Sequence, residues 1–210
     1  MKMKFCRQSA RLIAILAVCA GFAQADPVAP PSPQTWRVAV VGYQRPAGTM
    51  VSVIPGALKT ELAAARETAV GDLAFLTQAD FEALGIDWKT FQAKSAPAAS
   101  ALLAGLKPEW IRDRNQVIEC AILRAAKPSD DITPVILAPD FLKRFTPIFG
   151  RKILIVAPDR RTLFLFPRLA SRYQDYGDRV AAVYRKSDAS VSREVFELSD
   201  TGLRAIGEYE

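Results

Sequence analysis

The amino-acid sequence predicts an α+β fold, a largely antiparallel sheet with packed helices. Strand-like and helix-like segments are mixed along the chain without the regular βαβ alternation that a parallel sheet requires. In the second half, two apolar runs separated by a short charged segment indicate an antiparallel hairpin. Hydrophobic residues make up 50% of the chain, enough to bury the core of one domain over 35–210 or of two units that divide near residue 107.

The first 25 residues have the three-part layout of a secretory signal peptide. A cationic stretch precedes the eleven-residue apolar run LIAILAVCAGF, which is shorter than the roughly 20 residues needed to cross a bilayer. The small residues of AQA at 23–25 then predict cleavage after Ala25. The cations of the leader are Lys2, Lys4, Arg7 and Arg11.

A protein with this leader is expected in the periplasm or outside the cell. Residues 26–34, DPVAPPSPQ, form an extended Pro-rich linker ahead of the fold. The alternative is a lipid anchor at Cys19, which follows an apolar stretch. Against that alternative, Val18 is larger than the small residue expected before a lipidated cysteine.

Removal of the leader changes the charge and the cysteine count. The chain has 28 Lys and Arg against 22 Asp and Glu, so loss of the four leader cations leaves 24 against 22, a net charge of +2. A nearly neutral domain lacks the positive field of a nucleic-acid-binding protein. Only Cys120 remains, which excludes an intrachain disulfide. We therefore expect no nucleic-acid partner and no transmembrane span in the mature chain.

In the first half, residues 35–43 and 50–55 have the β-branched and aromatic character of strands. The Ala-, Leu- and Glu-rich segment 56–69 predicts a helix. A short helix is expected over 77–85, capped by Thr77 with Asp80 completing a capping box. A further helix starts at Asp87, and Pro97 either breaks it or begins another.

In the second half, residues 116–125 predict a strand, and 138–150 predict a helix that ends near Thr146, before Pro147. The runs KILIVAP and TLFLFP predict a central hairpin with its turn at APDR, 157–160. Residues 193–209 close the chain as two strands joined at 200–202. Between these hairpins, 169–187 has helical spacing, with one apolar stripe of Leu169, Tyr173, Tyr176, Val180, Val183 and Tyr184.

The residue types limit the chemistry. Histidine is absent, which removes the commonest general base and the commonest metal ligand. Its absence also excludes Cys–His zinc sites and Ser–His or Cys–His nucleophile pairs. No phosphate-binding Gly-rich loop is present. We therefore expect no cofactor and no metal. Cys120 shares a strand face with two isoleucines and is expected to be buried and unreactive, while Glu119 is expected to face solvent.

Two charged segments remain as candidates. Asp130 and Asp131 follow Pro128 and are interpreted as a turn or helix start, with calcium ligation as the alternative. The charged segment after Pro158 is interpreted first as a turn. In the sharper hypothesis, its arginines project from the hairpin and bind an anion or an acidic partner, since the guanidinium group suits bidentate oxyanion contacts. The residues of this site are Asp159, Arg160, Arg161 and Arg168.

Three stretches between residues 73 and 206 carry a family resemblance: LAFLTQADFEALGIDWKTFQAKSAPAASALL, PVILAPDFLKRFTPIFGRKILIVAPDRRTLFLFP and SVSREVFELSDTGL. They resemble the YtpQ-like family of bacterial proteins of unknown function. The resemblance implies that the PDRR turn belongs to a recurrent feature of the fold, and it assigns no activity and no catalytic residue. Typical members look cytosolic, whereas this chain has a secretory leader.

The leading hypothesis is an exported, non-catalytic protein of the cell envelope that binds a small anionic ligand or a protein partner. It is motivated by a well-formed core pattern without a catalytic constellation. The alternative is a hydrolase that uses carboxylate or Ser–Lys groups brought together by the fold, although no serine lies in a recognisable nucleophile turn. A third option is an adaptor in envelope assembly, which would show a large exposed apolar patch.

Overall fold

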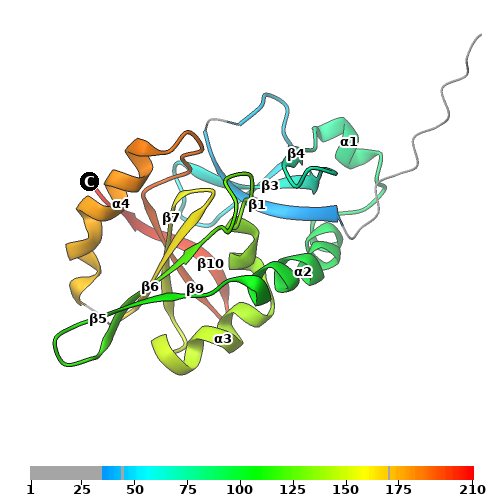
Figure 1. Cartoon of the computed structure of the whole chain (residues 1–210). Coiled ribbons are helices and arrows are strands. Elements are labelled where there is room, and N and C mark those ends of the chain that lie inside the picture. The colour runs from blue at the N-terminus through cyan, green and yellow to red at the C-terminus, as the bar shows by residue number, and fades with distance from the viewer. Residues whose placement is uncertain (1–34, 44, 170) are drawn as a thin grey trace, which may run out of the picture.

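A computed structural model describes residues 35–43, 45–169 and 171–210 (Figure 1). It has two antiparallel sheets with packed helices, which confirms the predicted α+β class. The expected leader at 1–25 and linker at 26–34 lie outside the described residues. Among the residues that are described, no helix has both the length and the apolar character needed to cross a membrane.

The smaller sheet is built around β3 (Thr60–Glu67), a strand the sequence did not predict. On one side it pairs with β1 (Trp36–Gly42), and on the other with β2 (Val51–Val53) and β4 (Leu73–Phe75), which lie end to end. The helix predicted over 56–69 is therefore wrong. Hydrogen bonding to strands on both sides outweighs the weak helix propensity of an Ala-rich segment, whose small side chains fit both faces of a covered sheet.

Two helices follow the smaller sheet. Helix α1 (Gln78–Glu82) has the predicted capping box between Thr77 and Asp80, and α2 (Trp88–Gly105) begins after the predicted N-cap Asp87. The break expected at Pro97 is wrong, because α2 continues through it. Pro97 lies on the exposed side of the helix, as does Ala93, the residue whose carbonyl loses its helical partner, so water can replace the missing bond.

The larger sheet has six strands in the order β10-β9-β7-β8-β6-β5, all antiparallel. It contains every strand predicted in the second half, together with the edge strand β5, which was not predicted. The strands are β5 (Glu109–Arg112), β6 (Ile118–Arg124), β7 (Ile153–Asp159), β8 (Thr162–Pro167), β9 (Glu194–Ser199) and β10 (Gly202–Glu208). Both strands of the central hairpin, β7 and β8, are buried on both faces, as their continuous apolar character predicted.

The hairpin turn lies two residues later than expected. Arg160 and Arg161 form it, between the paired residues Asp159 and Thr162, whereas the sequence placed it at 157–160. Pro158 instead lies within β7, where the pairing with β8 shifts register between Val156 and Asp159. Proline has no N–H to give to the ladder, so it disturbs the strand locally without ending it.

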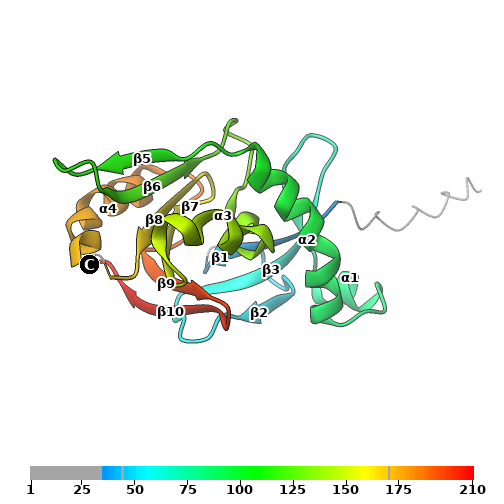
Figure 2. The same cartoon turned by 90° about the horizontal axis from the view of Figure 1, so that it is seen from below.

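Helices cover both faces of the larger sheet (Figure 2). On one face lies α3 (Asp140–Phe149), preceded by the 3-10 helix η2 (Thr133–Leu137). The expected end of α3 at Thr146 is wrong, because Phe149 continues the buried row of Phe141 and Phe145 at helical spacing. As in α2, the proline within α3, Pro147, is exposed.

The opposite face is covered by the 3-10 helix η3 (Ser171–Tyr176) and by α4 (Gly177–Lys186). Their Tyr173, Tyr176, Val180 and Val183 contact the sheet, as the predicted stripe requires. Leu169 does not belong to this stripe, since it is 97% exposed and lies before the first helical residue. The predicted single helix therefore begins later and in the tighter 3-10 geometry.

One hydrophobic core joins the two sheets. It contains side chains of β1, β3, α2, α3 and the α3-facing side of β7 and β9, so residues on both sides of position 107 share it. A second cluster lies under α4 and includes Cys120, which is fully buried as predicted. Burial raises the pKa of the Cys120 thiol to about 12, so the thiolate needed for reactivity is suppressed.

Candidate functional site

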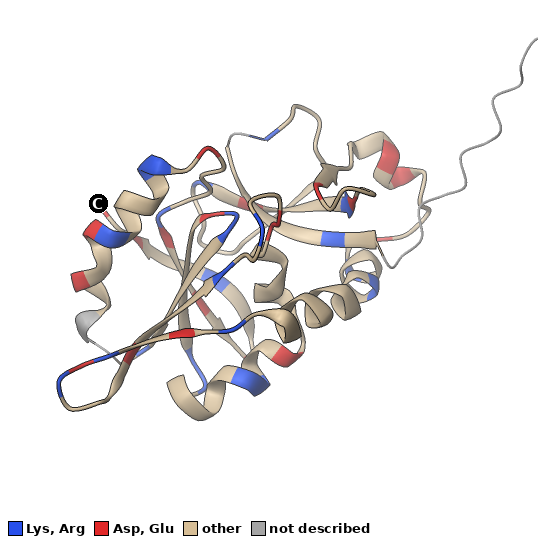
Figure 3. Ribbon diagram, in the orientation of Figure 1, with Lys and Arg blue, Asp and Glu red and all other residues tan. Residues whose placement is uncertain are grey.

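Charged residues of both signs are interspersed over the sheets and helices of the described chain (Figure 3). Many of them form ion pairs, such as Arg37 with Glu67 and Arg45 with Glu61 on neighbouring parts of the smaller sheet. A charged residue by itself therefore does not indicate a site. A site is better indicated where several charges meet beside a cavity or around a buried group.

The segment between α4 and β9 is held along the end of the β7–β8 hairpin. The backbone N–H groups of Val191 and Ser192 donate to the carbonyl oxygens of Pro158 and Ala157, at 2.9 and 3.1 Å. The N–H of Arg160 donates to the carbonyl of Ala189 at 3.1 Å. These bonds fix the position of residues 189–192, which form one wall of a cavity.

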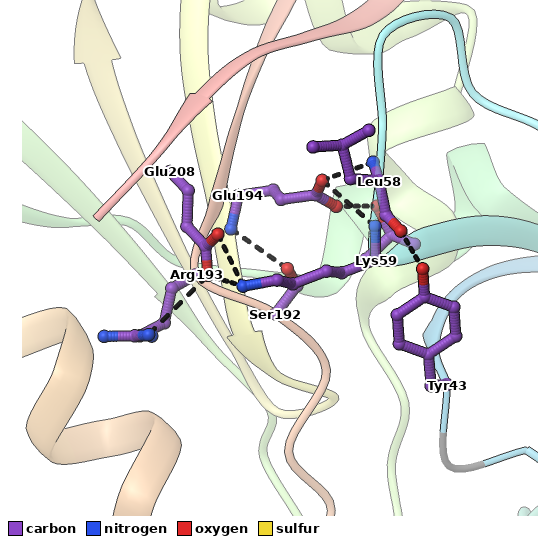
Figure 4. Close-up of polar contacts among 8 residues, drawn as sticks. Tyr43, Leu58, Lys59, Ser192, Arg193, Glu194 and Glu208 are labelled. Carbon is purple, nitrogen blue, oxygen red and sulfur yellow. Dashed lines mark hydrogen bonds and ion pairs between the residues drawn. The ribbon is translucent and has the colours of Figure 1, made fainter. Parts of the chain in front are cut away.

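Glu194, the first residue of β9, joins the larger sheet to the start of β3. Its carboxylate accepts the backbone N–H groups of Leu58 and Lys59, at 2.6 and 3.1 Å, and the hydroxyl of Thr60 at 2.5 Å (Figure 4). Only 3% of Glu194 is exposed. Its own N–H donates to Ser192 Oγ at 3.0 Å, so Glu194 contacts one wall of the cavity through its carboxylate and the other through its backbone.

The cavity itself has a volume of about 240 Å³ and is lined by residues from both sheets and from α4. At its rim, Lys59 Nζ lies 2.6 Å from the carboxylate of Glu208, and an Arg193 guanidinium nitrogen lies 3.6 Å from the same carboxylate. The Arg193 guanidinium also stacks on the ring of Tyr184, at 5.8 Å from its centre. Tyr43, Ser190 and Ser192 complete the polar lining.

The two walls approach closely at Gly42, the last residue of β1. A Cβ atom at this position would lie 2.4 Å from the carbonyl oxygen of Val191, a contact that real side chains do not make. A glycine is therefore required for the end of β1 to reach the segment that precedes β9. The side chain of Tyr43 follows directly, and its hydroxyl donates to the carbonyl of Leu58.

The sequence-predicted arginines of the hairpin turn lie beside this segment, and each contacts a carboxylate of the chain. Arg161 donates to Ser187 Oγ at 3.1 Å and forms an ion pair with Asp188. Arg160 Nε lies 3.8 Å from Asp131 Oδ2, and its guanidinium stacks on Phe75 at 5.2 Å from the ring centre. Both arginines thus contribute to packing of the turn against its neighbours.

The other predicted site residues are placed apart. Asp159 is buried and accepts the N–H of Arg161 at 3.0 Å, which stabilises the turn. Arg168 follows the end of β8 that lies away from the turn. At a rise of roughly 3.3 Å per residue, this end is about 20 Å from the turn. There it bonds Glu197 of β9. The structure therefore brings Asp159, Arg160 and Arg161 together and leaves Arg168 in a separate cluster.

Asp131 lies behind Arg160 and has an unusual environment. Its Oδ1 accepts the N–H and the hydroxyl of Thr133, at 2.9 and 2.7 Å, so it holds the turn that leads into η2, in line with the turn interpretation. Its side chain is only 5% exposed, and Oδ2 finds no hydrogen-bond partner among the described residues. Burial raises the pKa of Asp131 to about 6, against the opposing effects of the Thr133 bonds and the Arg160 charge.

A hydrolase could use Glu119 and Asp159, but the structure does not bring these carboxylates together. Glu119 of β6 accepts a hydrogen bond from the Tyr176 hydroxyl at 3.5 Å, so its side chain is engaged by η3 where exposure to solvent was expected. The pairing of β6 with β8 places it at the end of β8 away from Asp159. Within the described ranges, no three acidic or thiol side chains are arranged to hold a metal ion.

The cavity residues Lys59, Arg193, Glu194 and Glu208 were not predicted from the sequence, because they come from segments far apart in the chain. One signal was present in REVFEL: Glu194 shares a strand face with Phe196 and Leu198, which are buried in the main core. A carboxylate on a core-facing position needs buried hydrogen-bond donors, and their presence could have been inferred.

No family model, curated protein or solved structure matches this chain. The resemblance to the YtpQ-like family therefore stays a prediction. The function of the chain is inferred from the contacts, burial and charges of its described residues.

Proposed function

We propose that this protein is an exported, non-catalytic binding protein of the cell envelope whose cavity takes a small anionic ligand. The observation that carries the proposal is the convergence of two cations, Lys59 and Arg193, on one carboxylate at the cavity rim. A ligand carboxylate that replaces Glu208 in this arrangement would gain two charge-assisted hydrogen bonds. The secretory layout of the leader supports the envelope location.

The cavity supports this role better than the predicted arginine turn does. Arg160 and Arg161 already contact Asp131 and Asp188, and Arg161 holds the loop that bears the cavity wall. At the rim, the side chains of Lys59 and Glu208 are partly exposed, at 48% and 30%, and both line the cavity. Exposed ion pairs contribute only about 0–1 kcal/mol, so a ligand can displace Glu208 at small cost.

The hydrolase alternative draws on one further observation: Lys59, Ser190 and Ser192 line the same cavity. A Ser–Lys mechanism needs a free lysine amine beside a serine hydroxyl. Here Lys59 Nζ is bound to Glu208, and Ser192 Oγ is the acceptor for the Glu194 N–H. This arrangement favours binding over acyl transfer.

The proposal is tested by titrating the purified chain with acetate, succinate and citrate in an isothermal calorimeter. We expect at least one of these carboxylates to bind, and both Lys59→Gln and Arg193→Gln to weaken its binding tenfold or more. Arg112→Gln serves as the matched control, because Arg112 lies in the β5–β6 hairpin, bonds the Gln116 carbonyl and does not line the cavity. Arg161→Gln tests the turn as the alternative site of the anion.

If Arg161→Gln weakens binding and the two cavity variants do not, the anion binds at the turn and the proposal is contradicted. The proposal is also contradicted if none of the three probes binds. The hydrolase alternative predicts a different result. It requires cleavage of a simple nitrophenyl ester that is lost in Ser192→Ala or Ser190→Ala, and such an activity would also overturn a non-catalytic role.

A further inference from the structure

A second group of cations lies on the larger sheet, away from the cavity, around Glu197 of β9. We call it the Glu197 cluster: Lys152, Arg168, Glu197 and Arg204. Arg168 Nε lies 2.9 Å from Glu197 Oε2, and Arg204 donates to Oε1 from two nitrogens, at 2.7 and 3.1 Å. Lys152 Nζ lies 3.8 Å from Oε1, so three cations surround one carboxylate.

The carboxylate at the centre is an internal anchor for the cluster. Only 3% of the Glu197 side chain is exposed, whereas 46% of Arg168 and 57% of both Lys152 and Arg204 are exposed. Burial alone would raise the pKa of Glu197, but the bonds from Arg204 and Arg168 outweigh it and hold this pKa below its usual value. Glu197 therefore stays ionised and holds the cations in place at neutral pH.

The charge of the cluster is not balanced. Three cations and one anion leave a net charge of +2 on half-exposed side chains. Arg168 uses Nε for Glu197, and within the described residues its two terminal nitrogens make no hydrogen bond. A guanidinium fixed through Nε presents a planar pair of N–H donors, which matches two oxygens of a tetrahedral or carboxylate anion.

We infer that the Glu197 cluster is a second anion site, specific for a phosphate group that carries two negative charges. A phosphate monoester has a charge of about −1.5 to −2 at neutral pH and three acceptor oxygens, which complements a net charge of +2. The buried anchor lowers the entropic cost of ordering three long side chains. The site takes free phosphate or the phosphate headgroup of a lipid by the same chemistry.

The Glu197 cluster is separate from the proposed cavity. In the register of the β9–β10 hairpin, Arg204 lies opposite Glu197 near the middle of the strands. Glu208, at the cavity rim, lies opposite Glu194 at the end of the hairpin away from its turn. Four residues along β10 separate the two positions, about 13 Å at the rise of a strand. Variants can therefore remove one site and leave the other.

The test is a calorimetric titration of the full chain with inorganic phosphate, alongside sedimentation with phosphatidylcholine vesicles that do or do not contain phosphatidic acid. We expect Arg168→Gln and Arg204→Gln to weaken phosphate binding tenfold or more and Lys152→Gln to weaken it less, because Lys152 makes the longest contact. Arg112→Gln, in the exposed β5–β6 hairpin, is expected to have no effect.

Binding to phosphatidic acid vesicles without binding of free phosphate would identify the lipid headgroup as the source, and the reverse would identify a soluble phosphate; both outcomes support the site. Loss of phosphate binding in Arg193→Gln with binding retained in Arg204→Gln would place the anion in the cavity and overturn the inference. An equal loss in Arg112→Gln and Arg204→Gln would overturn it as well. So would binding of neither probe by the unaltered chain. Since Lys152→Gln alters only a half-exposed side chain, it keeps the test valid if an arginine variant fails to fold.

Discussion

The buried carboxylate of Glu194 provides the sharpest test of how the two sheets are joined. Replacement by alanine removes the acceptor of three hydrogen bonds, from the N–H groups of Leu58 and Lys59 and from the Thr60 hydroxyl. Leu58 and Lys59 are exposed, so water can reach their amides. Each amide that loses its acceptor therefore lowers the free energy of unfolding by about 1 kcal/mol, the low end of the range for a lost hydrogen-bond partner. Thr60 is buried, and its hydroxyl costs about 2 kcal/mol.

The expected loss for Glu194→Ala is therefore about 4 kcal/mol, a large part of the roughly 5–15 kcal/mol that stabilises a domain. Glu194→Gln is the matched control. Its side-chain oxygen can accept both amides, and its NH₂ group can donate to a rotated Thr60 hydroxyl. We expect this variant to lie within about 1 kcal/mol of the unaltered chain, because hydrogen bonding is retained.

The assay is urea unfolding followed by tryptophan fluorescence, since the chain has 3 Trp residues. A loss below about 1 kcal/mol for Glu194→Ala would refute the reasoning, because it would mean that the three donors find other partners at little cost. An equal, large loss in both variants would instead show that the negative charge matters and the hydrogen bonds do not.

The titration of Asp131 and the backbone at Gly56 offer two further tests. The pKa of Asp131 is about 6 in the folded chain against 3.8 for the ordinary group, so the native state holds this proton more tightly than the unfolded chain does. The stabilisation that results from the bound proton is complete below pH 3.8 and is lost as the pH rises through 6. Relative to Asp131→Asn, the unaltered chain should therefore lose on the order of 3 kcal/mol across that window, measured by unfolding at several pH values; a flat difference would exclude a raised pKa. Gly56→Ala should destabilise the chain by more than about 1 kcal/mol in the same assay, because Gly56 has a φ of +78° and a Cβ there would lie 2.6 Å from the carbonyl oxygen of Ala205. A urea midpoint equal to that of the unaltered chain would show that this backbone can shift.

Local signals in the sequence predicted local structure well. The capping box of Thr77 and Asp80, the cap at Asp87 and the closing hairpin were all confirmed, because each depends on residues within a few positions of one another. The helix predicted for 56–69 failed for the opposite reason. What makes β3 a strand is pairing with β1, β2 and β4, and no residue within the segment itself indicates that environment.

The two prolines show a second limit. Pro97 and Pro147 were expected to end helices, but the sequence did not reveal that each would lie on an exposed helical side. The cost of a missing hydrogen bond depends on access to water, which is a property of the folded molecule. The buried rows on the opposite sides, such as Phe141 and Phe149, are sufficient to continue each helix past its proline.

The candidate site was less predictable than the fold. The sequence singled out Asp159, Arg160, Arg161 and Arg168 because charged residues stand out between apolar runs. Their ion-pair partners, among them Asp188 and Glu197, lie about 27 to 29 residues away along the chain. Whether an arginine is available for a ligand depends on such partners, and these are known only once the sheets are assembled.

The rim of the cavity also determines when the proposed ligand site is complete. Lys59 and Glu208 are 149 positions apart, and Glu208 enters the sheet with its last strand. A nascent chain therefore has no complete binding cavity until residue 208 has emerged and β10 has paired with β9. Contacts of such long sequence separation form late and slow the folding reaction. In the proposed function, ligand capture therefore waits for the pairing of β10 with β9.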